Sequence, residues 1–492
     1  MQESIRRFSL AIFAVSAVLS ATSPVVAQRF TRVDLARAIE QTLVETIATA
    51  EKSVVAIARV QKETPGEALQ LELRVDPFGR RPGLLGNPSP TDPDFIPNQY
   101  ATGVVVGREG LILTTYHVLA PQSDYYVTTV DRQVYQATIR AADPRSDLAV
   151  LSIAATDLVP IRFADDRPLR KGRIVVALGN PHAIARDGQV SAAWGIVANL
   201  MRKAPPEPGH VESAGKTTLH HYGTLIQTDA KLNLGTSGGP LLDLSGHMVG
   251  LLTSLPGATG YQREAGYAIP VDPAFRRIVA TLKQGREVEY GFLGIQPGNL
   301  TQKEILAGLR GMRVERVTPG PGTPAAAGGI EAGDIITAVN GLPILDADHL
   351  VLEIGRMPVD SVARITILRR GRRRDLDVRL GKYPVRGRKI VTVGPEPWRG
   401  LQVDYPTVPI DPTYRSANEP VYFESAVLVT EVQQESPAWE AGLRPGMSIS
   451  HVAGRAVRTP SEFRTVVAGR AGPLTVRLTE PDSPERVISP ES

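Results

Sequence analysis

The sequence lacks cysteine entirely, and it carries little net charge for its length. Without thiols, the chain has no disulfide bonds, no thiolate metal sites and no cysteine nucleophile. A net charge of +4 over 492 residues argues against a nucleic-acid-binding protein, which carries a concentrated basic face. The apolar content of 42% is ordinary for globular proteins, and the length indicates about two to four domains.

The N-terminus has the layout of a secretory signal peptide over residues 1–27. Arg6 and Arg7 precede an apolar stretch at 8–21, which is shorter than the roughly 20 residues of a membrane helix. We expect cleavage after the small residues that close the segment, with an uncleaved membrane anchor as the alternative. The mature protein is therefore predicted to be exported, and an exported chain without cysteine fits a bacterial periplasm.

The next segments predict a helix, a strand and a long loop ahead of a β-rich region. Residues 31–50 carry an apolar residue every four positions, which is typical of one helical stripe: Leu35, Ile39, Leu43 and Ile47. Residues 53–60 resemble a strand, and the dense prolines of 61–98 indicate a long exposed loop. From 100 to 280, short β-rich runs alternate with turn residues, which favours a barrel or sandwich over βαβ units.

An internal repeat follows the β-rich region. Residues 323–344 align with 436–457 at a constant offset, so two copies of one small module are expected. In the second copy, Thr459 is predicted as a helix N-cap with Glu462 as its capping-box partner. The stretch between the copies is rich in proline, glycine and basic residues, and we interpret it as a linker.

Ser237 lies in the glycine-rich segment LGTSGGPLLD, which on its own is more often a turn than an active site. A serine hydroxyl becomes a nucleophile only with a base in reach and a third group that orients the base. His117 ends one apolar strand-like run, and Asp147 precedes another, where a buried carboxylate needs a partner. The chain order His117, Asp147, Ser237 matches that of the chymotrypsin-type triad, so we expect one catalytic site.

The glycines around Ser237 fit the same chemistry. Gly235 can present its backbone N–H in a conformation that a bulkier residue resists. Together with the N–H of Ser237, it would form an oxyanion hole, where each donor is worth roughly 3–4 kcal/mol. Gly238 and Gly239 would leave room for a substrate backbone.

The segments TTYHVLA, DPRSDLAVL, ALGNP, QTDAKLNLGTSGGPLLDLSGHMVGLLT and GYAIP resemble the protease domain of the HtrA (DegP-like) family of serine endopeptidases. The repeats resemble the two PDZ domains of that family. The resemblance implies a mainly β, multidomain protein with a chymotrypsin-like double β-barrel. His117 would be the general base, Asp147 the orienting acid and Ser237 the nucleophile.

The resemblance also implies a biological role. It implies ATP-independent cleavage of unfolded or damaged envelope proteins in the periplasm, with no metal or cofactor. It implies a homotrimer or a higher multiple, in which the loop at 61–98 can reach a neighbouring subunit's active site. The domains would be a signal peptide at 1–27, a trypsin-like protease domain at 28–285, PDZ1 at 286–383, a linker at 384–397, PDZ2 at 398–484 and a tail at 485–492.

Three features depart from the family pattern. Thr236 precedes the nucleophile where the family usually has asparagine, and its backbone can still serve the turn. Lys231 replaces a small residue and either favours acidic side chains of the substrate or points to solvent; we place it with Leu251 among the candidate peptide-binding residues. The segment 202–222 is longer than usual, and its histidines fit a surface loop better than a metal site: His210, His220 and His221.

The repeats are expected to bind chain termini, because PDZ domains add a peptide as a strand and receive its carboxylate on backbone N–H groups. The first copy contains a carboxylate-loop type of motif, YGFLGI, whose candidate peptide-binding residues are Phe292, Leu293, Gly294 and Ile295. The second copy has the looser match WRGLQV, with Met447 and Ala453 in place of Asp334 and Asn340. We expect the first copy to bind peptide and the second to serve assembly.

Other interpretations remain open at this point. The run RRGRRR at 369–374 is interpreted as a solvated hairpin turn, with contact to anionic lipid or nucleic acid as the alternative. The chain could be a non-catalytic chaperone or scaffold, although a complete triad argues against this. It could also be an esterase or acyltransferase, although α/β-hydrolases order their triad as serine, acid, histidine.

Overall fold

The computed structural model describes residues 31–62, 99–165, 167–180, 189–205, 216–232, 235–253, 266–319, 323–407, 426–480 and 483–490. The predicted signal peptide, nearly all of the predicted loop at 61–98, and His210 lie outside these residues. The chain divides into two units, residues 1–45 and 46–492. No helix within the described ranges is long and apolar enough to cross a membrane.

Helix α2 (Arg32–Ala50) confirms the helix predicted over residues 31–50. Its apolar stripe is only partly covered, because Leu35 and Ile39 are 56% and 47% exposed. A 3₁₀ turn, η1 (Glu51–Ser53), then leads into β1 (Val54–Gln61), the strand predicted from the run SVVAIARV.

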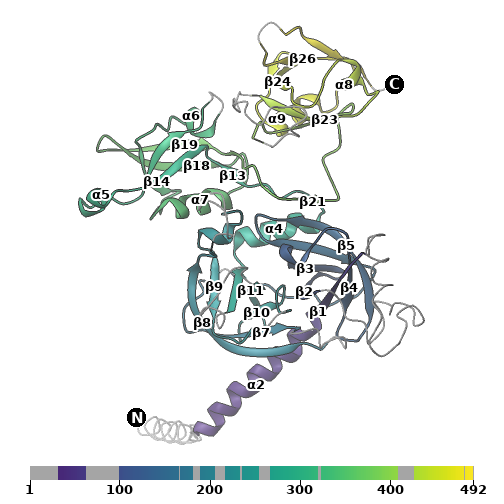
Figure 1. Cartoon of the computed structure of the whole chain (residues 1–492), viewed down its shortest axis with the longest axis vertical. Helices are drawn as coiled ribbons and strands as arrows, with labels where there is room; N and C mark the ends of the chain where they lie inside the picture. The colour runs from purple at the N-terminus through teal and green to yellow at the C-terminus, as the bar shows by residue number, and fades with distance from the viewer. Residues whose placement is uncertain are drawn as a thin grey trace, which may run out of the picture. The chain divides into compact units, whose positions relative to one another are not determined.

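The first barrel is built from antiparallel strands whose buried core residues are apolar and mostly branched. The order is β5-β4-β1-β2-β3-β6, and β6 pairs with β5 to close the barrel (Figure 1). Val127, Ile112 and Leu151 are 0% exposed in its core. Its strands are β1, β2 (Gln99–Gly107), β3 (Leu111–Thr115), β4 (Ser123–Thr128), β5 (Val134–Asp143) and β6 (Leu148–Ile153).

The second barrel closes in the order β10-β11-β12-β9-β8-β7. The β-rich region predicted for residues 100–280 is thereby confirmed as barrels rather than a sandwich, and so is the double β-barrel implied by the family resemblance. Helix α4 (Pro273–Lys283) follows, begins at the N-cap Asp272 and packs against β5 and β6 of the first barrel. The strands of the second barrel are β7 (Ile174–Gly179), β8 (Ser191–Arg202), β9 (Leu225–Thr228), β10 (Pro240–Leu242), β11 (Met248–Thr253) and β12 (Gly266–Pro270).

The two sequence repeats fold into sheets with the same strand order. The first sheet runs β14-β15-β16-β18-β19, with β17 paired to β16, and the short β13 pairs with β20. Helices α5 (Gln302–Leu306), α6 (Pro324–Ala327) and α7 (Ala347–Arg356) belong to this copy. Its strands are β13 (Gly291–Phe292), β14 (Ile295–Asn299), β15 (Met312–Val317), β16 (Ile335–Val339), β17 (Leu342–Pro343), β18 (Val362–Arg369), β19 (Arg372–Arg379) and β20 (Gly381–Lys382).

The second sheet runs β22-β23-β24-β26-β27, with β25 paired to β24. Thr459 caps α9 (Pro460–Val467) by accepting from the N–H of Glu462, as predicted. Glu462 itself reaches back to the N–H of Arg458 rather than to that of the cap. The remaining elements of this copy are β22 (Leu401–Asp404), β23 (Val427–Val432), α8 (Pro437–Glu440), β24 (Ser448–Val452), β25 (Arg455–Ala456), β26 (Leu474–Leu478) and β27 (Arg486–Ile488).

The basic run at 369–374 forms the predicted hairpin turn between β18 and β19. Arg369 pairs with Arg372 across the turn, and both Arg370 and Gly371 have positive φ, which suits a two-residue hairpin. Arg369 itself is not free in solvent, because its guanidinium binds the buried carboxylate of Asp334 at 2.7 Å.

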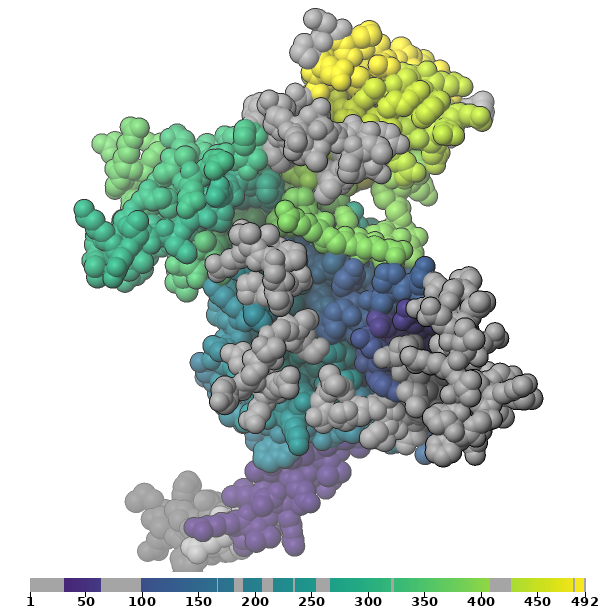
Figure 2. Space-filling view, in the orientation of Figure 1, coloured from purple at the N-terminus to yellow at the C-terminus, as the bar shows by residue number. Residues whose placement is uncertain are grey.

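The stretch between the repeats contains a strand that sequence analysis did not anticipate. Strand β21 (Ile390–Val391) pairs with β5 at the edge of the first barrel. Directly after it, the backbone N–H groups of Thr392 and Val393 donate to the carbonyl of Gly285 at 3.0 and 2.9 Å. Figure 2 shows this green segment against the blue of the first barrel. The expected linker is therefore hydrogen-bonded to the first barrel and to Gly285.

Two valines of the first barrel provide a matched test of its core. Val127 is fully buried, whereas Val134 is 36% exposed. We expect Val127→Ala to lower the free energy of unfolding by about 2 kcal/mol, because it removes two buried methyl groups and leaves a cavity. Val134→Ala should change it by less than about 0.5 kcal/mol. Calorimetric melting of the full-length chain measures both, and equal shifts would contradict this core.

Candidate active site

The strand pairing of the first barrel brings His117 and Asp147 to one end of two neighbouring strands. Thr115, the last residue of β3, pairs with Leu148, the first residue of β6. His117 follows in the 3₁₀ turn η2 (Tyr116–Val118), and Asp147 immediately precedes β6. The two residues thus meet although they lie far apart in the sequence.

The carboxylate of Asp147 binds both the side chain and the backbone of His117. The Nδ1 atom of His117 lies 2.9 Å from Oδ2 and 3.1 Å from Oδ1 of the carboxylate. The backbone N–H of His117 also donates to Oδ1 at 3.0 Å. Because a carboxylate of this kind accepts, Nδ1 carries the proton, and Nε2 is the nitrogen with a lone pair.

The second barrel supplies a further partner for the same carboxylate. The hydroxyl of Thr253, the last residue of β11, donates to Oδ2 of Asp147 at 3.2 Å. Its neighbour Leu252 exchanges backbone hydrogen bonds with the two glycines that follow Ser237: it accepts from Gly238 at 2.8 Å and donates to Gly239 at 2.7 Å. Adjacent residues of β11 therefore hold Asp147 and the turn that carries Ser237.

The Ser237 turn is also fixed to the first barrel. Thr102 of β2 donates its backbone N–H to the carbonyl of Ser237 at 2.9 Å and its hydroxyl to that of Gly235 at 2.8 Å. Gly238 has φ of +87°, and a Cβ there would lie 2.0 Å from the carbonyl oxygen of Thr102. Only glycine fits such a close approach, so the contact between the barrels requires glycine at position 238 whatever the chemistry of the turn.

The electrostatics of the pair favour an ionised acid beside a basic imidazole. Burial acts to lower the pKa of His117, but the charge and hydrogen bond of Asp147 outweigh it, and the pKa is raised. Burial acts to raise the pKa of Asp147, but His117 reverses the effect, and the pKa is lowered. The site therefore stabilises a protonated imidazole next to a carboxylate.

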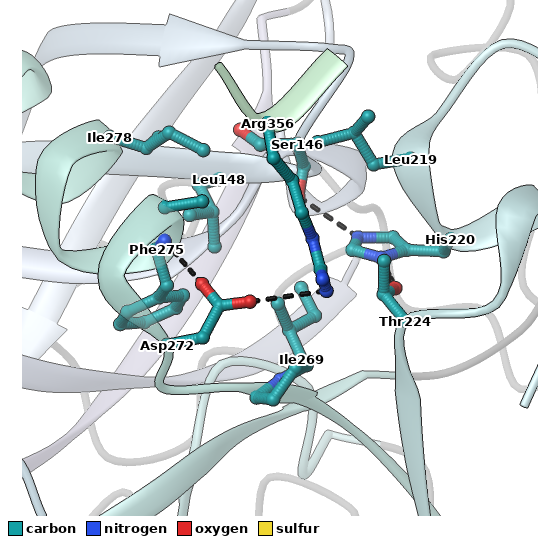
Figure 3. A pocket seen from close by; sticks show the side chains of 12 residues that line it. Ser146, Leu148, Leu219, His220, Thr224, Ile269, Asp272, Phe275, Ile278 and Arg356 are labelled. Atoms are coloured by element: carbon teal, nitrogen blue, oxygen red, sulfur yellow. Dashed lines mark hydrogen bonds and ion pairs between the residues drawn. The ribbon is translucent and has the colours of Figure 1, made fainter. Parts of the chain in front are cut away.

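His220 and His221 are not in a surface loop, and that prediction is wrong for both. They are 5% and 6% exposed in the 3₁₀ turn η4 (Leu219–Tyr222). Nε2 of His220 donates to the carbonyl of Ser146 at 2.9 Å, and Nδ1 accepts from Thr224 (Figure 3). Burial lowers the pKa of His220, which favours the neutral ring. Through its hydrogen bond, this ring supports Ser146, the residue next to Asp147.

Two cavities adjoin the site. One of about 370 Å³ is lined by Tyr116, His117 and Thr253, and also by Arg386 and Gly387 from the stretch between the repeats. The other, of about 160 Å³, lies behind the turn and is lined by Ala192, Ala193, Lys231 and Thr236.

The two residues of the barrels that were predicted to bind peptide, Lys231 and Leu251, differ in their exposure. Lys231 is exposed and lines the second cavity. Leu251 is 0% exposed within β11, so its side chain does not make the expected contact. Thr253 was missed, because nothing in LLTS distinguishes it from any other strand-end threonine. The described ranges hold no cluster of three or more histidine, aspartate or glutamate residues that could bind a metal ion.

Comparison with known proteins gives three domain matches and relatives that are similar over about three quarters of this chain. The family models that match are a trypsin-like peptidase domain at 101–251 and a PDZ domain at 291–380 and again at 428–479. A probable periplasmic serine endoprotease DegP-like of Pseudomonas putida (strain GB-1) is 30% identical over 398 residues, covering 77% of this chain and 79% of the relative.

Two further matches agree with these. A protein of the same description from Brucella suis biovar 1 is 31% identical over 392 residues, covering 78% of this chain and 71% of the relative. Among solved structures, the HtrA-type protease AlgW with decapeptide matches with a TM-score of 0.50 and 26% identity, over 69% of this chain and 98% of that one.

The His117–Asp147 pair can be tested by removing its negative charge. Asp147→Asn should lower the pKa of His117 from above the usual value of about 6.5 to below it, because burial then acts without the opposing carboxylate. NMR titration of the imidazole signal, assigned with His117→Gln, measures the midpoint. Exposed Asp131→Asn is the control, and an unchanged midpoint in Asp147→Asn would contradict the pairing.

Proposed function

This chain is a serine endopeptidase of the HtrA, or DegP-like, family, and we propose that Ser237 is its nucleophile, His117 its general base and Asp147 its orienting acid. The observation that carries the proposal is the contact between Nδ1 of His117 and the buried carboxylate of Asp147 at 2.9 Å. With Nδ1 protonated and held, Nε2 is the atom that can accept a proton from a serine hydroxyl.

In the proposed reaction, Oγ of Ser237 attacks the carbonyl carbon of the scissile peptide bond while Nε2 of His117 takes its proton. The backbone N–H groups of Gly235 and Ser237 stabilise the oxyanion. The imidazolium then protonates the leaving amine, and water hydrolyses the acyl-enzyme by the reverse proton path. The raised pKa of His117 and the lowered pKa of Asp147 suit this step, because both favour the imidazolium–carboxylate state. The chemistry requires no metal or cofactor.

The proposed substrates are unfolded or damaged proteins of the periplasm, cleaved without ATP by an assembly of three subunits or a multiple of three. The similar chains described as periplasmic support the compartment. We further propose that PDZ1 binds the C-termini of proteins and that PDZ2 serves assembly. For PDZ1, the support is a cavity of about 80 Å³ between the loop at 291–295 and α7.

The catalytic role of Ser237 predicts that Ser237→Ala lowers casein cleavage by at least about 10⁴-fold, because no nucleophile remains. The fold should persist, as judged by an unchanged circular dichroism spectrum and melting temperature. Ser245→Ala is the matched control, since Ser245 is an exposed serine in the next turn. A fluorophosphonate probe should label the wild type and Ser245→Ala only. Cleavage near wild type in Ser237→Ala would refute the mechanism, whereas a wild type that neither cleaves casein nor reacts with the probe would leave a scaffold role.

Lys231 is proposed to favour acidic substrate side chains, since its cation lines the cavity beside Thr236. Lys231→Met should then lower the share of cleavages next to aspartate or glutamate by about threefold, which corresponds to about 0.7 kcal/mol of discrimination. Mass spectrometry of peptides from denatured casein measures this share. Lys171→Met, at an exposed lysine of the same barrel, is the control. If Lys231→Met and the wild type give identical cleavage patterns, Lys231 points to solvent and does not select the substrate.

A further inference from the structure

Arg145 stands two residues before Asp147, and its side chain is buried at 1% exposure. None of its three guanidinium nitrogens has a hydrogen-bond partner among the residues that the structure describes. A charge removed from water normally recovers its lost hydration from a hydrogen-bonded anion. A wholly buried arginine without one points to a ligand that supplies the anion.

The immediate neighbours attract the cation without using its N–H groups. The Cζ atom of Arg145 lies 3.5 Å from the ring centroid of Tyr383 and 5.4 Å from that of Tyr290. The nearby carboxyl of Asp143 accepts hydrogen bonds from Ser146 and Tyr290 at Oδ2 only, and its buried Oδ1 makes no hydrogen bond to Arg145. Burial raises the pKa of Asp143, which weakens it as a counter-charge. The aromatic rings therefore hold the guanidinium in place, while its buried N–H groups have no hydrogen-bond partner among the described residues.

Arg145 lines the PDZ1 groove, which we define as the cavity of about 80 Å³ between residues 291–295 and α7. The guanidinium reaches α7 at Gly355, where a Cβ would lie 3.2 Å from Nη2. The rest of the wall is mainly apolar: Phe292, Leu293, Ile295, Leu350, Val351 and Ile354. One cation in an apolar pocket is suited to a chain end that has a hydrophobic last side chain and a carboxylate.

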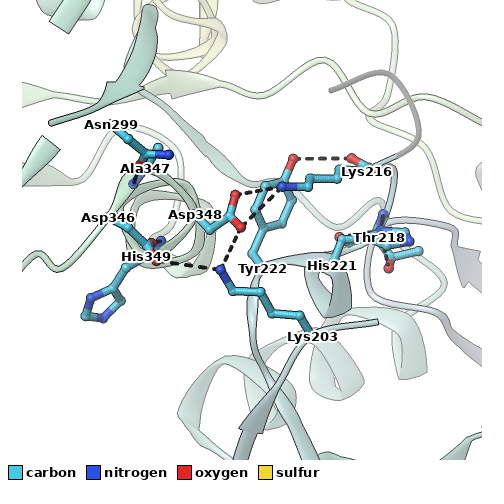
Figure 4. A network of polar contacts seen from close by, with 10 residues as sticks. All are labelled: Lys203, Lys216, Thr218, His221, Tyr222, Asn299, Asp346, Ala347, Asp348 and His349. Atoms are coloured by element: carbon cyan, nitrogen blue, oxygen red, sulfur yellow. Dashed lines mark hydrogen bonds and ion pairs between the residues drawn. The ribbon is translucent and has the colours of Figure 1, made fainter. Parts of the chain in front are cut away.

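Ion pairs hold α7 against the protease barrels, so that this wall is shared between domains. Asp348 of α7 binds Lys203 at 2.7 Å and Lys216 at 3.0 Å (Figure 4). At the other end of the helix, Arg356 binds Asp272, the N-cap of α4, at 3.1 Å. The first barrel thus contributes Arg145 to the PDZ1 groove while the second barrel and α4 fix the helix on its far side.

We propose that Arg145, a residue of the protease barrel, binds the α-carboxylate of a peptide C-terminus in the PDZ1 groove. The planar guanidinium can donate two parallel hydrogen bonds to a carboxylate, which adds to the backbone N–H groups that a PDZ loop offers. The proposal deepens the proposed function of PDZ1 and rests on it. Because Arg145 belongs to the first barrel, it can contribute to the groove only when PDZ1 contacts that barrel.

The test compares free-acid and amidated peptides, because only the free acid carries the group that Arg145 would bind. The probes are fluorescein-labelled decapeptides, identical except for a last residue of valine, leucine or phenylalanine. Binding to the full-length Ser237→Ala chain is measured by fluorescence anisotropy. We expect the best acid to bind at least tenfold more tightly than its amide.

The variant Arg145→Gln should then weaken acid binding about tenfold and change amide binding less than twofold. Arg145→Lys, which keeps the charge but not the fork, should be intermediate; it also serves if the glutamine variant does not fold. Arg108→Gln, an exposed arginine of the same barrel, is the matched control and should leave both affinities unchanged.

Val351→Glu places a negative charge in the groove and separates the two levels of the hypothesis. If it leaves acid binding at the wild-type level, the peptide binds elsewhere, and the PDZ1 function fails together with the role of Arg145. If it abolishes binding but Arg145→Gln keeps the acid-to-amide ratio, the PDZ1 function stands and the role of Arg145 falls. An equal loss of acid and amide in Arg145→Gln would make Arg145 only a clamp between the tyrosines.

Discussion

The buried carboxylate of Asp147 is the group on which the arrangement of the two barrels depends. Its oxygens take hydrogen bonds from the ring and backbone of His117 in the first barrel and from Thr253 in the second. An ion this deeply buried is stable only when such donors surround it. The pairing of β3 with β6 already brings His117 and Asp147 together within the first barrel. Strand β11 of the second barrel supplies Thr253 and also holds the turn of Ser237, so the contact between the barrels positions that turn relative to the pair.

Local sequence patterns predicted helix α2, the strand-rich barrels and the repeats, and they singled out His117 and Asp147, which the structure brings together. His117 and Asp147 adjoin strands whose apolar runs are unmistakable, and the repeat revealed itself by its constant offset. The Thr459 cap followed from a short-range pattern. In each case the deciding interaction joins residues close in sequence, or the residue type itself restricts the chemistry.

What the sequence could not supply depends on contacts between distant segments. His220 looked like one of several polar loop histidines, and only its pairing with Ser146 explains its burial. The strand β21 spans two residues, too short for any periodicity to register. Leu251 and Thr253 stand two apart in one strand, yet the first is buried in the barrel and the second reaches Asp147. The role proposed for Arg145 likewise depends on PDZ1 residues that lie far from it in the sequence.

The hydrogen bonds at Gly285 change how the domain series is understood. The chain leaves the protease region after Gly285 and comes back to that same carbonyl at Thr392 and Val393, once β21 has joined the first barrel. PDZ1 is therefore inserted between two segments that are both attached to the protease region, and this attachment at both ends restricts how far PDZ1 can move. A chain cut between the repeats, ahead of β21, would lose a strand that pairs with the first barrel. In folding terms, the protease region therefore includes β21, which follows PDZ1 in the sequence.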